Sequence, residues 1–143
     1  MAETSVRIMQ CAVASTGLLR IDHIGVGIGI ILYSAFHKTG AGVHILAPSS
    51  GTPTPENPAK YADTAVHYVL DQLKKKGVKP PFSVAIAGGG TMLQSVASMG
   101  PRNVEAVKDA LKQAHLSVKH DQTGGSGIRS MVLDLETGKI NIT

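Results

Sequence analysis

Two segments of the chain have the apolar spacing of an amphipathic helix. Between residues 57 and 77, apolar positions recur every third or fourth residue and therefore share one helical face. Pro58 suits the first turn of this helix, and Gly77 suits the position just past its end. A second helix is predicted over residues 103–115, where Asn103 is a suitable N-cap residue. We expect both helices to pack one apolar face on the core.

Most of the remaining apolar pattern is extended. Strands are predicted over residues 5–13, 18–33, 42–46, 82–87, 116–119, 129–135 and 139–142, the last two as a hairpin through residues 136–138. Strands cluster at both ends of the chain, whereas a doubly wound fold would alternate strand and helix regularly. The order therefore favours an α+β fold, with mixed, largely antiparallel β-sheets and two main helices packed as an α/β sandwich. We expect a single domain over residues 1–143.

The stretch HIGVGIGIILYS, residues 23–34, has glycine at every second position in its first half. It is not a dinucleotide-binding loop, because the third glycine comes one residue early and the chain continues as a strand where a helix is needed. It is also not a membrane span, because its apolar run is well short of the ~20 residues that such a helix needs. We interpret it as a strand. A second glycine cluster, residues 88–90, fits a tight strand exit; the alternative is a backbone anion nest before a short helix.

Composition narrows the function classes. Hydrophobic residues make up 43% of the chain and charged residues 17%, which suits a globular protein. The net charge of +4 allows an acidic partner, but the chain has two Phe, three Tyr and no Trp, which argues against binding nucleic acid by base stacking. The N-terminus lacks the pattern of a signal peptide, so we expect a soluble cytoplasmic protein with no membrane insertion.

Metal and cofactor chemistry find little support in the residues. Cys11 is the single cysteine, which excludes an internal disulfide and a cysteine-based zinc site. The six histidines form no H-x-x-x-H pair. We therefore expect no metal and no cofactor. Among the histidines, His44 lies within an apolar predicted strand, where a buried imidazole is expected to have a hydrogen-bond partner.

Several segments together resemble the CheD family of chemoreceptor glutamine deamidases. They are GAGVHILAP around His44, KYADTAV, VAIAGGGTM, GPRNVEAVKDAL and DQTGGSGIRSMVLDLETGKI, in this order over residues 5–142. The resemblance implies an α/β sandwich and a reaction without metal or organic cofactor. In that reaction a cysteine thiolate attacks the side-chain amide of a receptor glutamine, ammonia leaves, and water releases glutamate. His44 corresponds to the family's catalytic histidine, which activates the thiol.

The chain departs from the family at the nucleophile. The family motif resembles L-G-x-G-S-C-V, with the cysteine seventeen residues before the histidine, and an ungapped count places Gly27 there. The motif's serine falls on Val26, and a family threonine six residues before the cysteine falls on Ile21. Since glycine has no side chain to attack an amide, we expect a non-catalytic binding or regulatory module of the chemoreceptor system. The alternative is an active glutamine deamidase that uses His44, with Cys11 as a substitute nucleophile.

The resemblance also implies partners. CheD proteins dock on chemoreceptor cytoplasmic helices and on the phosphatase CheC, so a CheC-like protein or a receptor is the expected partner here. The implied partner-binding residues are Arg102, Asn103, Thr123, Gly124, Gly125 and Arg129. For both arginines, structural pairing or simple solvation is the alternative role.

Overall fold

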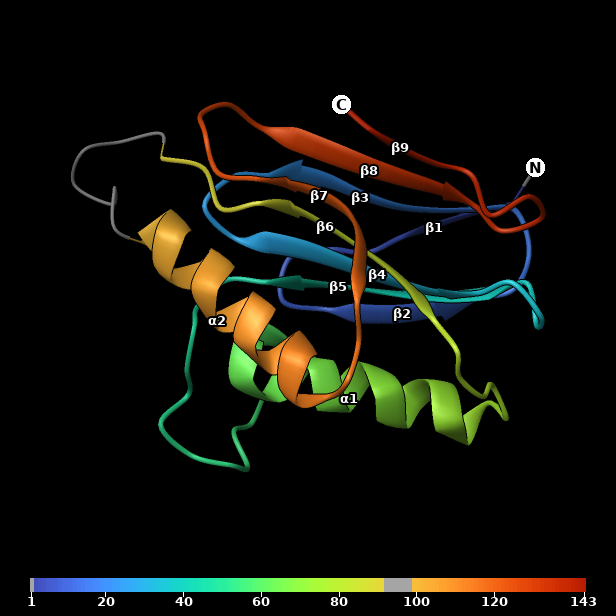
Figure 1. Cartoon of the computed structure of the whole chain (residues 1–143), viewed down its shortest axis with the longest axis horizontal. Helices are drawn as coiled ribbons and strands as arrows, with labels where there is room; N and C mark the ends of the chain where they lie inside the picture. The colour runs from blue at the N-terminus through green and yellow to red at the C-terminus, as the bar shows by residue number, and fades with distance from the viewer. Residues whose placement is uncertain (1, 92–98) are drawn as a thin grey trace.

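The computed structural model describes residues 2–91 and 99–143, and it contains nine strands and two α-helices in those ranges (Figure 1). In chain order these are β1 (Glu3–Ser5), β2 (Cys11–Ala14), β3 (Leu18–Ile24), β4 (Ile28–Ser34), β5 (Thr39–Ile45), α1 (Ala62–Lys75), β6 (Ser83–Gly88), α2 (Met99–Gln113), β7 (Val118–Thr123), β8 (Arg129–Asp134) and β9 (Ile140–Ile142). A 3-10 turn, η1 (Pro58–Lys60), precedes α1. The short helix considered after residues 88–90 would fall outside the described residues.

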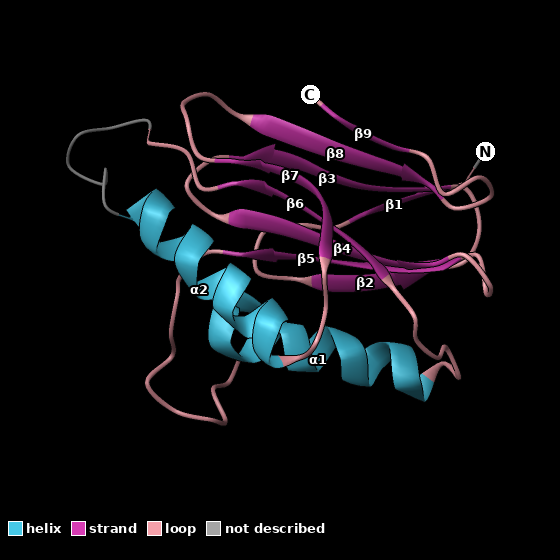
Figure 2. Ribbon diagram, viewed as in Figure 1, coloured by secondary structure: helices cyan, strands magenta, loops and turns pink. Residues whose placement is uncertain are grey.

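The strands form two stacked sheets. One has the strand order β1-β3-β8-β9 and the other the order β2-β5-β4-β6-β7; only the β1–β3 and β6–β7 pairs are parallel. Both helices cover the outer face of the five-stranded sheet, and the outer face of the four-stranded sheet stays open (Figure 2). The prediction of an α+β sandwich with largely antiparallel sheets is therefore confirmed.

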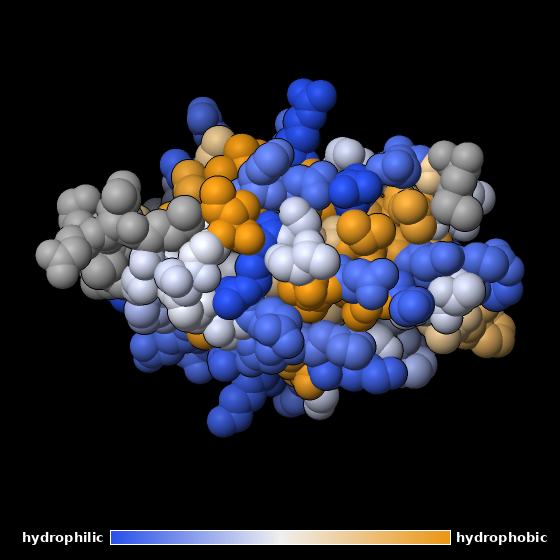
Figure 3. Space-filling model, turned by 90° about the horizontal axis from the view of Figure 1, so that it is seen from above, coloured by the Kyte–Doolittle hydropathy of each residue, from blue (hydrophilic) through white to orange (hydrophobic). Residues whose placement is uncertain are grey.

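The open face of the four-stranded sheet carries hydrophilic side chains among smaller hydrophobic patches (Figure 3). An ionic row crosses it, in which the Arg20 guanidinium contacts Glu3 at 3.1 Å and Asp22 at 2.9 Å. Such partly exposed pairs contribute little to stability, on the order of 1 kcal/mol or less each. The row instead makes this uncovered face of the sheet hydrophilic.

Apolar side chains form two cores, one on each side of the five-stranded sheet. Ile30 and Leu32 of β4 face the helices, whereas Ile31 and Tyr33 face the four-stranded sheet. Because β4 is buried on both faces, its sequence is apolar up to Ser34 and shows no period-two alternation. No helix in the described ranges is long and apolar enough to cross a membrane.

The prediction of one strand over residues 18–33 is wrong. β3 and β4 belong to different sheets, and residues 25–27 carry the chain from one sheet to the other. Gly29 then serves close packing, because a Cβ there would lie 2.7 Å from Ile24 Cδ1 and 2.9 Å from Met131 Sδ of the facing sheet. The predicted strand over residues 5–13 likewise divides into β1 and β2, in different sheets.

The helix termini test the predicted capping. Gly77 follows α1 with φ +76°, the left-handed conformation expected just past a helix end. Asn103 is not an N-cap, however, because α2 already begins at Met99 and places Asn103 inside the helix. The predicted hairpin is confirmed as antiparallel β8 and β9.

Candidate functional site

His44 lies near the end of β5 and points between the two sheets. It pairs with Gly29 across the strands, and its neighbours Val43 and Ile45 point to the opposite face, toward the helices. Side chains alternate along a strand, so His44 shares its face with Gly42. Only 3% of its surface is exposed. The imidazole is therefore held in a fixed place by the sheet.

Gly27 lies directly beside this imidazole. A Cβ built on Gly27 would lie 3.4 Å from His44 Nε2. The same Cβ would collide with the carbonyl oxygen of Ile45. The pairing of positions 27 and 44 is thus the one that a nucleophile and its base require, but the β5 backbone occupies the space of any side chain at position 27. Glycine is the residue that this close approach accepts.

The hydrogen-bonding state of His44 is unusual. Its Nδ1 atom is buried and has no partner among the described residues. Burial lowers the pKa of the His44 imidazole, which favours the neutral ring. Ile21 is fully buried on the same side of the sheet, and its Cδ1 would lie 3.3–3.4 Å from a Cβ at Gly29 or Gly42, the neighbours of His44. This hydrocarbon side chain offers the imidazole no hydrogen bond.

Cys11 lies on the other side of the sheet. It pairs with Val43 of β5 and packs against the apolar core beneath the helices. His44 follows Val43 and so faces the opposite way. Desolvation by burial raises the pKa of the Cys11 thiol to about 11, so that the thiolate is scarce at neutral pH. The structure does not bring Cys11 and His44 together.

A pocket of about 440 Å³ opens beside His44. It is lined by Ser5, Val6, Arg7, Ile8, Asp22, His23 and His44. The register of β3 shifts between Ile21 and Ile24, and His23 within this bulge has φ +56°. Bulges near sites redirect side chains, and here the bulge brings His23 to the pocket. Sequence reasoning missed His23; the signal was available, because the L-G-x-G-S-C-V motif has glycine at this position.

Asn103 connects α2 to both segments of the site. Its Nδ2 donates to the carbonyl oxygens of Val26, at 2.9 Å, and Leu46, at 3.1 Å. Val26 directly precedes Gly27, and Leu46 lies two residues after His44. Asn103 is fully buried, so its side chain cannot contact a partner on this surface, contrary to the sequence-based expectation. It instead holds the two segments in register.

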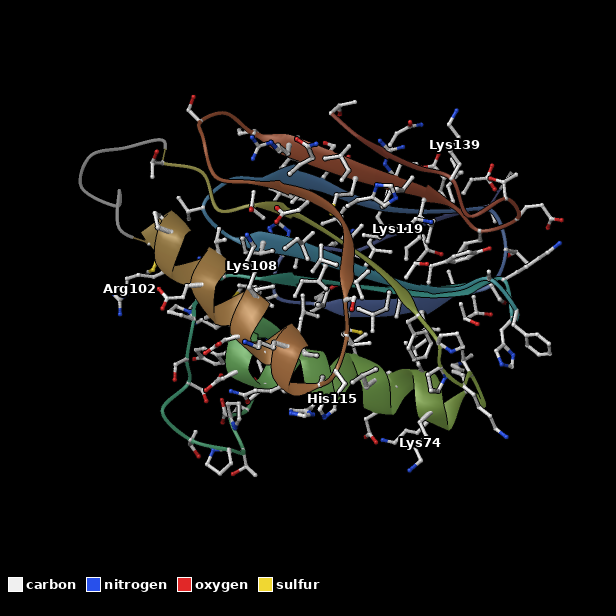
Figure 4. All side chains as sticks on the ribbon, viewed as in Figure 1. Lys74, Arg102, Lys108, His115, Lys119 and Lys139 are labelled. Carbon is white, nitrogen blue, oxygen red and sulfur yellow. The ribbon has the colours of Figure 1, made fainter. Side chains whose placement is uncertain are left out.

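The other predicted partner-binding residues gather near the start of α2. Arg102 is exposed there (Figure 4), and Thr123, Gly124 and Gly125 line an adjoining pocket of about 570 Å³ with Pro101 and Val104. Arg129 is half-buried, and its Nη1 donates to the Gly124 carbonyl at 2.8 Å, which is the structural pairing considered as its alternative role. Lys108 of α2, which also lines this pocket, contacts Asp121 of β7 at 3.0 Å (Figure 4).

The glycine cluster at residues 88–90 is a strand exit. The N–H groups of Gly89, Gly90 and Thr91 donate to the carbonyls of Gly27, Gly25 and Gly125. An anion nest needs free N–H groups, and these three are occupied. The described residues also contain no group of three or more His, Cys, Asp or Glu side chains arranged to hold a metal.

The fold and site together define a class of protein. It is an α+β sandwich that holds a buried strand histidine against the loop entering the neighbouring strand, an arrangement suited to amide hydrolysis when that loop supplies a nucleophile. Comparison with known families agrees: residues 46–143 match CheD, described as chemotactic sensory transduction. The match begins just after His44, so Ile21, Gly27 and His44 lie outside it.

Individual relatives extend the similarity. The chain is 40% identical over 119 residues to "Chemoreceptor glutamine deamidase CheD" of Thermotoga maritima, covering 82% of this chain and 75% of the relative. It is 39% identical over 123 residues to "Probable chemoreceptor glutamine deamidase CheD" of Methanococcus vannielii, covering 83% and 80%. The equally named protein of Thermococcus kodakarensis is 33% identical over 147 residues, covering 98% and 91%. The chain belongs to the CheD family.

Proposed function

We propose that this chain is a non-catalytic CheD-like module of the cytoplasmic chemoreceptor system, which binds a partner through the retained scaffold. One observation carries the proposal: at the family's nucleophile position the residue is Gly27, and the Ile45 carbonyl occupies the space that a side chain would need. The lack of a nucleophile at position 27 therefore involves the position of the backbone as well as the missing side chain. A protein closed in this way is suited to binding and not to covalent catalysis.

The rest of the site supports the same conclusion. Covalent amide hydrolysis needs a thiolate and a base that is oriented by a third group. Cys11 is half-buried on the opposite face of the sheet, and desolvation raises the pKa of its thiol. His44 has no partner for Nδ1 among the described residues. Within residues 2–91 and 99–143, neither a nucleophile beside His44 nor a group that orients its imidazole is in place.

For the binding surface we propose Arg102 with Thr123, Gly124 and Gly125, along the pocket at the start of α2. The relatives are named for action on chemoreceptors, so receptor cytoplasmic helices are the first partner to test, followed by a CheC-like phosphatase. Titration calorimetry with a receptor cytoplasmic fragment should show binding that weakens about tenfold in Arg102→Ala. Lys75→Ala, at the far end of α1, is the matched control and should bind as wild type does.

The alternative function is an active glutamine deamidase. It is favoured by the retained His44, whose Nε2 faces position 27 and could act on water. Mass spectrometry of a receptor fragment after incubation detects the mass gain from amide to acid. We expect no gain with the wild-type chain. A gain that disappears in His44→Ala would establish the alternative, and a further loss in Cys11→Ser would assign the nucleophile.

A further inference from the structure

We propose that the end of the molecule opposite the site docks on an anionic phospholipid surface, with the Phe36 ring entering the headgroup region and the lysines beside it facing the lipid phosphates. We call this end the Phe36 tip; it consists of residues 35–38, between β4 and β5, and residues 74–81, where α1 ends. The contact is peripheral and uses no spanning segment. It is independent of the proposed function, because position 27 and the surface at the start of α2 take no part in it.

Phe36 is the most exposed large hydrophobic side chain that the structure describes. Its accessible fraction is 89%, against 58% for Ile128, the next in order. The ring contacts His37 edge-to-face, with the ring centroids 5.0 Å apart, and belongs to neither hydrophobic core. Single exposed apolar side chains are common on proteins, so the neighbours of Phe36 decide what it can bind.

The loop after α1 extends the tip. The Lys79 N–H donates to Nε2 of His37 at 3.4 Å and so joins this loop to the β4–β5 turn. Pro80 and Pro81, the next two residues, are exposed and add apolar surface beside the turn. Figure 1 shows both segments at one end of the molecule, whereas α2 begins at the other end. The tip therefore combines two loops that are far apart in the sequence.

Three acidic side chains border the Phe36 tip, and a lysine lies close to each. They are Asp71, Asp134 and Glu136. Lys75 contacts Asp71 at 3.6 Å, and Lys38 contacts Glu136 at 2.9 Å. Lys139 lies across the β8–β9 turn from Asp134, whose N–H donates to the Lys139 carbonyl at 2.8 Å. These opposite charges cancel, so the net charge of the tip comes from other residues.

The unmatched charge comes from the end of α1 and the loop after it. The exposed lysines there that form no ion pair within residues 2–91 and 99–143 are Lys74, Lys76 and Lys79. Lys74 points outward from the last turn of the helix (Figure 4). Glu3 and Asp22 belong to the ionic row on the open face of the four-stranded sheet, so the five-stranded sheet separates them from these lysines. The tip is therefore cationic as well as apolar.

These properties fit a bilayer better than a protein. A standard protein interface buries about 800 Å² on each partner, whereas one Phe side chain supplies about 200 Å². The interfacial region of a bilayer accepts a single aromatic ring, and each basic residue near an anionic surface strengthens binding about fivefold. β5 runs from Thr39 beside the tip to Ile45 beside the site, so docking turns the site and the start of α2 away from the bilayer.

The test is co-sedimentation of the full chain with phosphatidylcholine vesicles and with vesicles that also contain phosphatidylserine. We expect binding to the phosphatidylserine vesicles, and binding at least about tenfold weaker to phosphatidylcholine alone. Added salt should release the chain, because it screens the lysines. Phe36→Ala and Lys79→Ala should each weaken binding about fivefold. Lys119→Ala removes the same charge from β7, away from the tip (Figure 4), and should bind as wild type does.

Phe36→Trp reports on the ring itself. The chain has no tryptophan, so the substituted side chain is the single indole, and its fluorescence should shift to shorter wavelength on phosphatidylserine vesicles. Equal binding to both kinds of vesicle, no binding to either, or full binding in both Phe36→Ala and Lys79→Ala would overturn the inference. Fluorescence that keeps its aqueous wavelength on the bound chain would also overturn it. If vesicles do not bind and a receptor fragment binds less tightly to Phe36→Ala, the tip serves a protein partner and the inference fails.

Discussion

The two faces of strand β5 have opposite characters. On the helix side, Ala41, Val43 and Ile45 are fully buried in a continuous apolar core. On the other side, Gly42 admits the side chains of the facing sheet, and the buried Nδ1 of His44 has no partner in the described part of the chain. A buried polar group left unpaired costs about 1–3 kcal/mol. The two faces of β5 therefore have different roles. The face toward the helices stabilises the fold, and the face toward the other sheet accepts the cost of an unpaired polar group at the site.

The largest effect is expected on the helix side. Leu73→Ala removes a fully buried side chain of α1 and should lower the free energy of unfolding by about 3 kcal/mol, since the cavity cannot close completely. Leu70→Ala, at a half-buried position of the same helix, is the matched control and should cost about 1 kcal/mol. Chemical denaturation measures both. Equal losses would remove the distinction between the buried face and the rest of the helix.

Gly27→Ala tests whether the inner side is closed against any side chain. The added methyl collides with the Ile45 carbonyl, so we expect a loss of about 2–3 kcal/mol. Gly90→Ala is the control, because a Cβ there meets its nearest atom at 3.4 Å, and it should cost less than about 1 kcal/mol. If Gly27→Ala were as stable as wild type, the space would be open, and the closed-site account would fail.

Asn103→Ala tests the link between α2 and the site. The substitution removes two hydrogen bonds, to Val26 and Leu46, and we expect a loss of about 2 kcal/mol. Hydrogen exchange should accelerate most at the amides of Leu46 and Gly89, which donate to the carbonyls of Lys60 and Gly27, because the segments that Asn103 holds are freed. A uniform acceleration over the whole chain would show that Asn103 supports the fold in general and not the site.

The smallest effect concerns pH. The folded-state pKa of His44 lies below its unfolded value, so below about pH 6.5 the unfolded chain binds a proton that the folded chain resists. This contribution to stability is complete above that pH and is lost as the pH falls through the folded pKa. The Tm of His44→Leu should therefore exceed that of wild type by more at pH 5 than at pH 7. A pH-independent difference would contradict the assignment.

The elements that could be predicted are those with local signals. The end of α1 at Gly77 and the β8–β9 hairpin follow from residues within one turn or strand of each feature. The division of residues 18–33 could not be predicted, because the apolar pattern continues across the crossing at residues 25–27 while the two strands join different sheets. Sheet membership depends on distant partners that a local pattern does not contain.

The candidate site was predictable only in part. His44 and Gly27 could be paired from their spacing in the family motif, and they do lie side by side. The collision with the Ile45 carbonyl, the bulge at His23 and the burial of Asn103 could not be read in advance. Each depends on backbone geometry or on contacts between elements far apart in the chain.

We propose above all that a glycine at position 27 leaves the chain without deamidase activity. The most direct measurement incubates one receptor cytoplasmic fragment with this chain and, in parallel, with the Thermotoga maritima relative, and follows glutamine conversion by mass spectrometry. We predict conversion by the relative and none by this chain. Conversion by the wild-type chain that is abolished by His44→Ala would contradict the account.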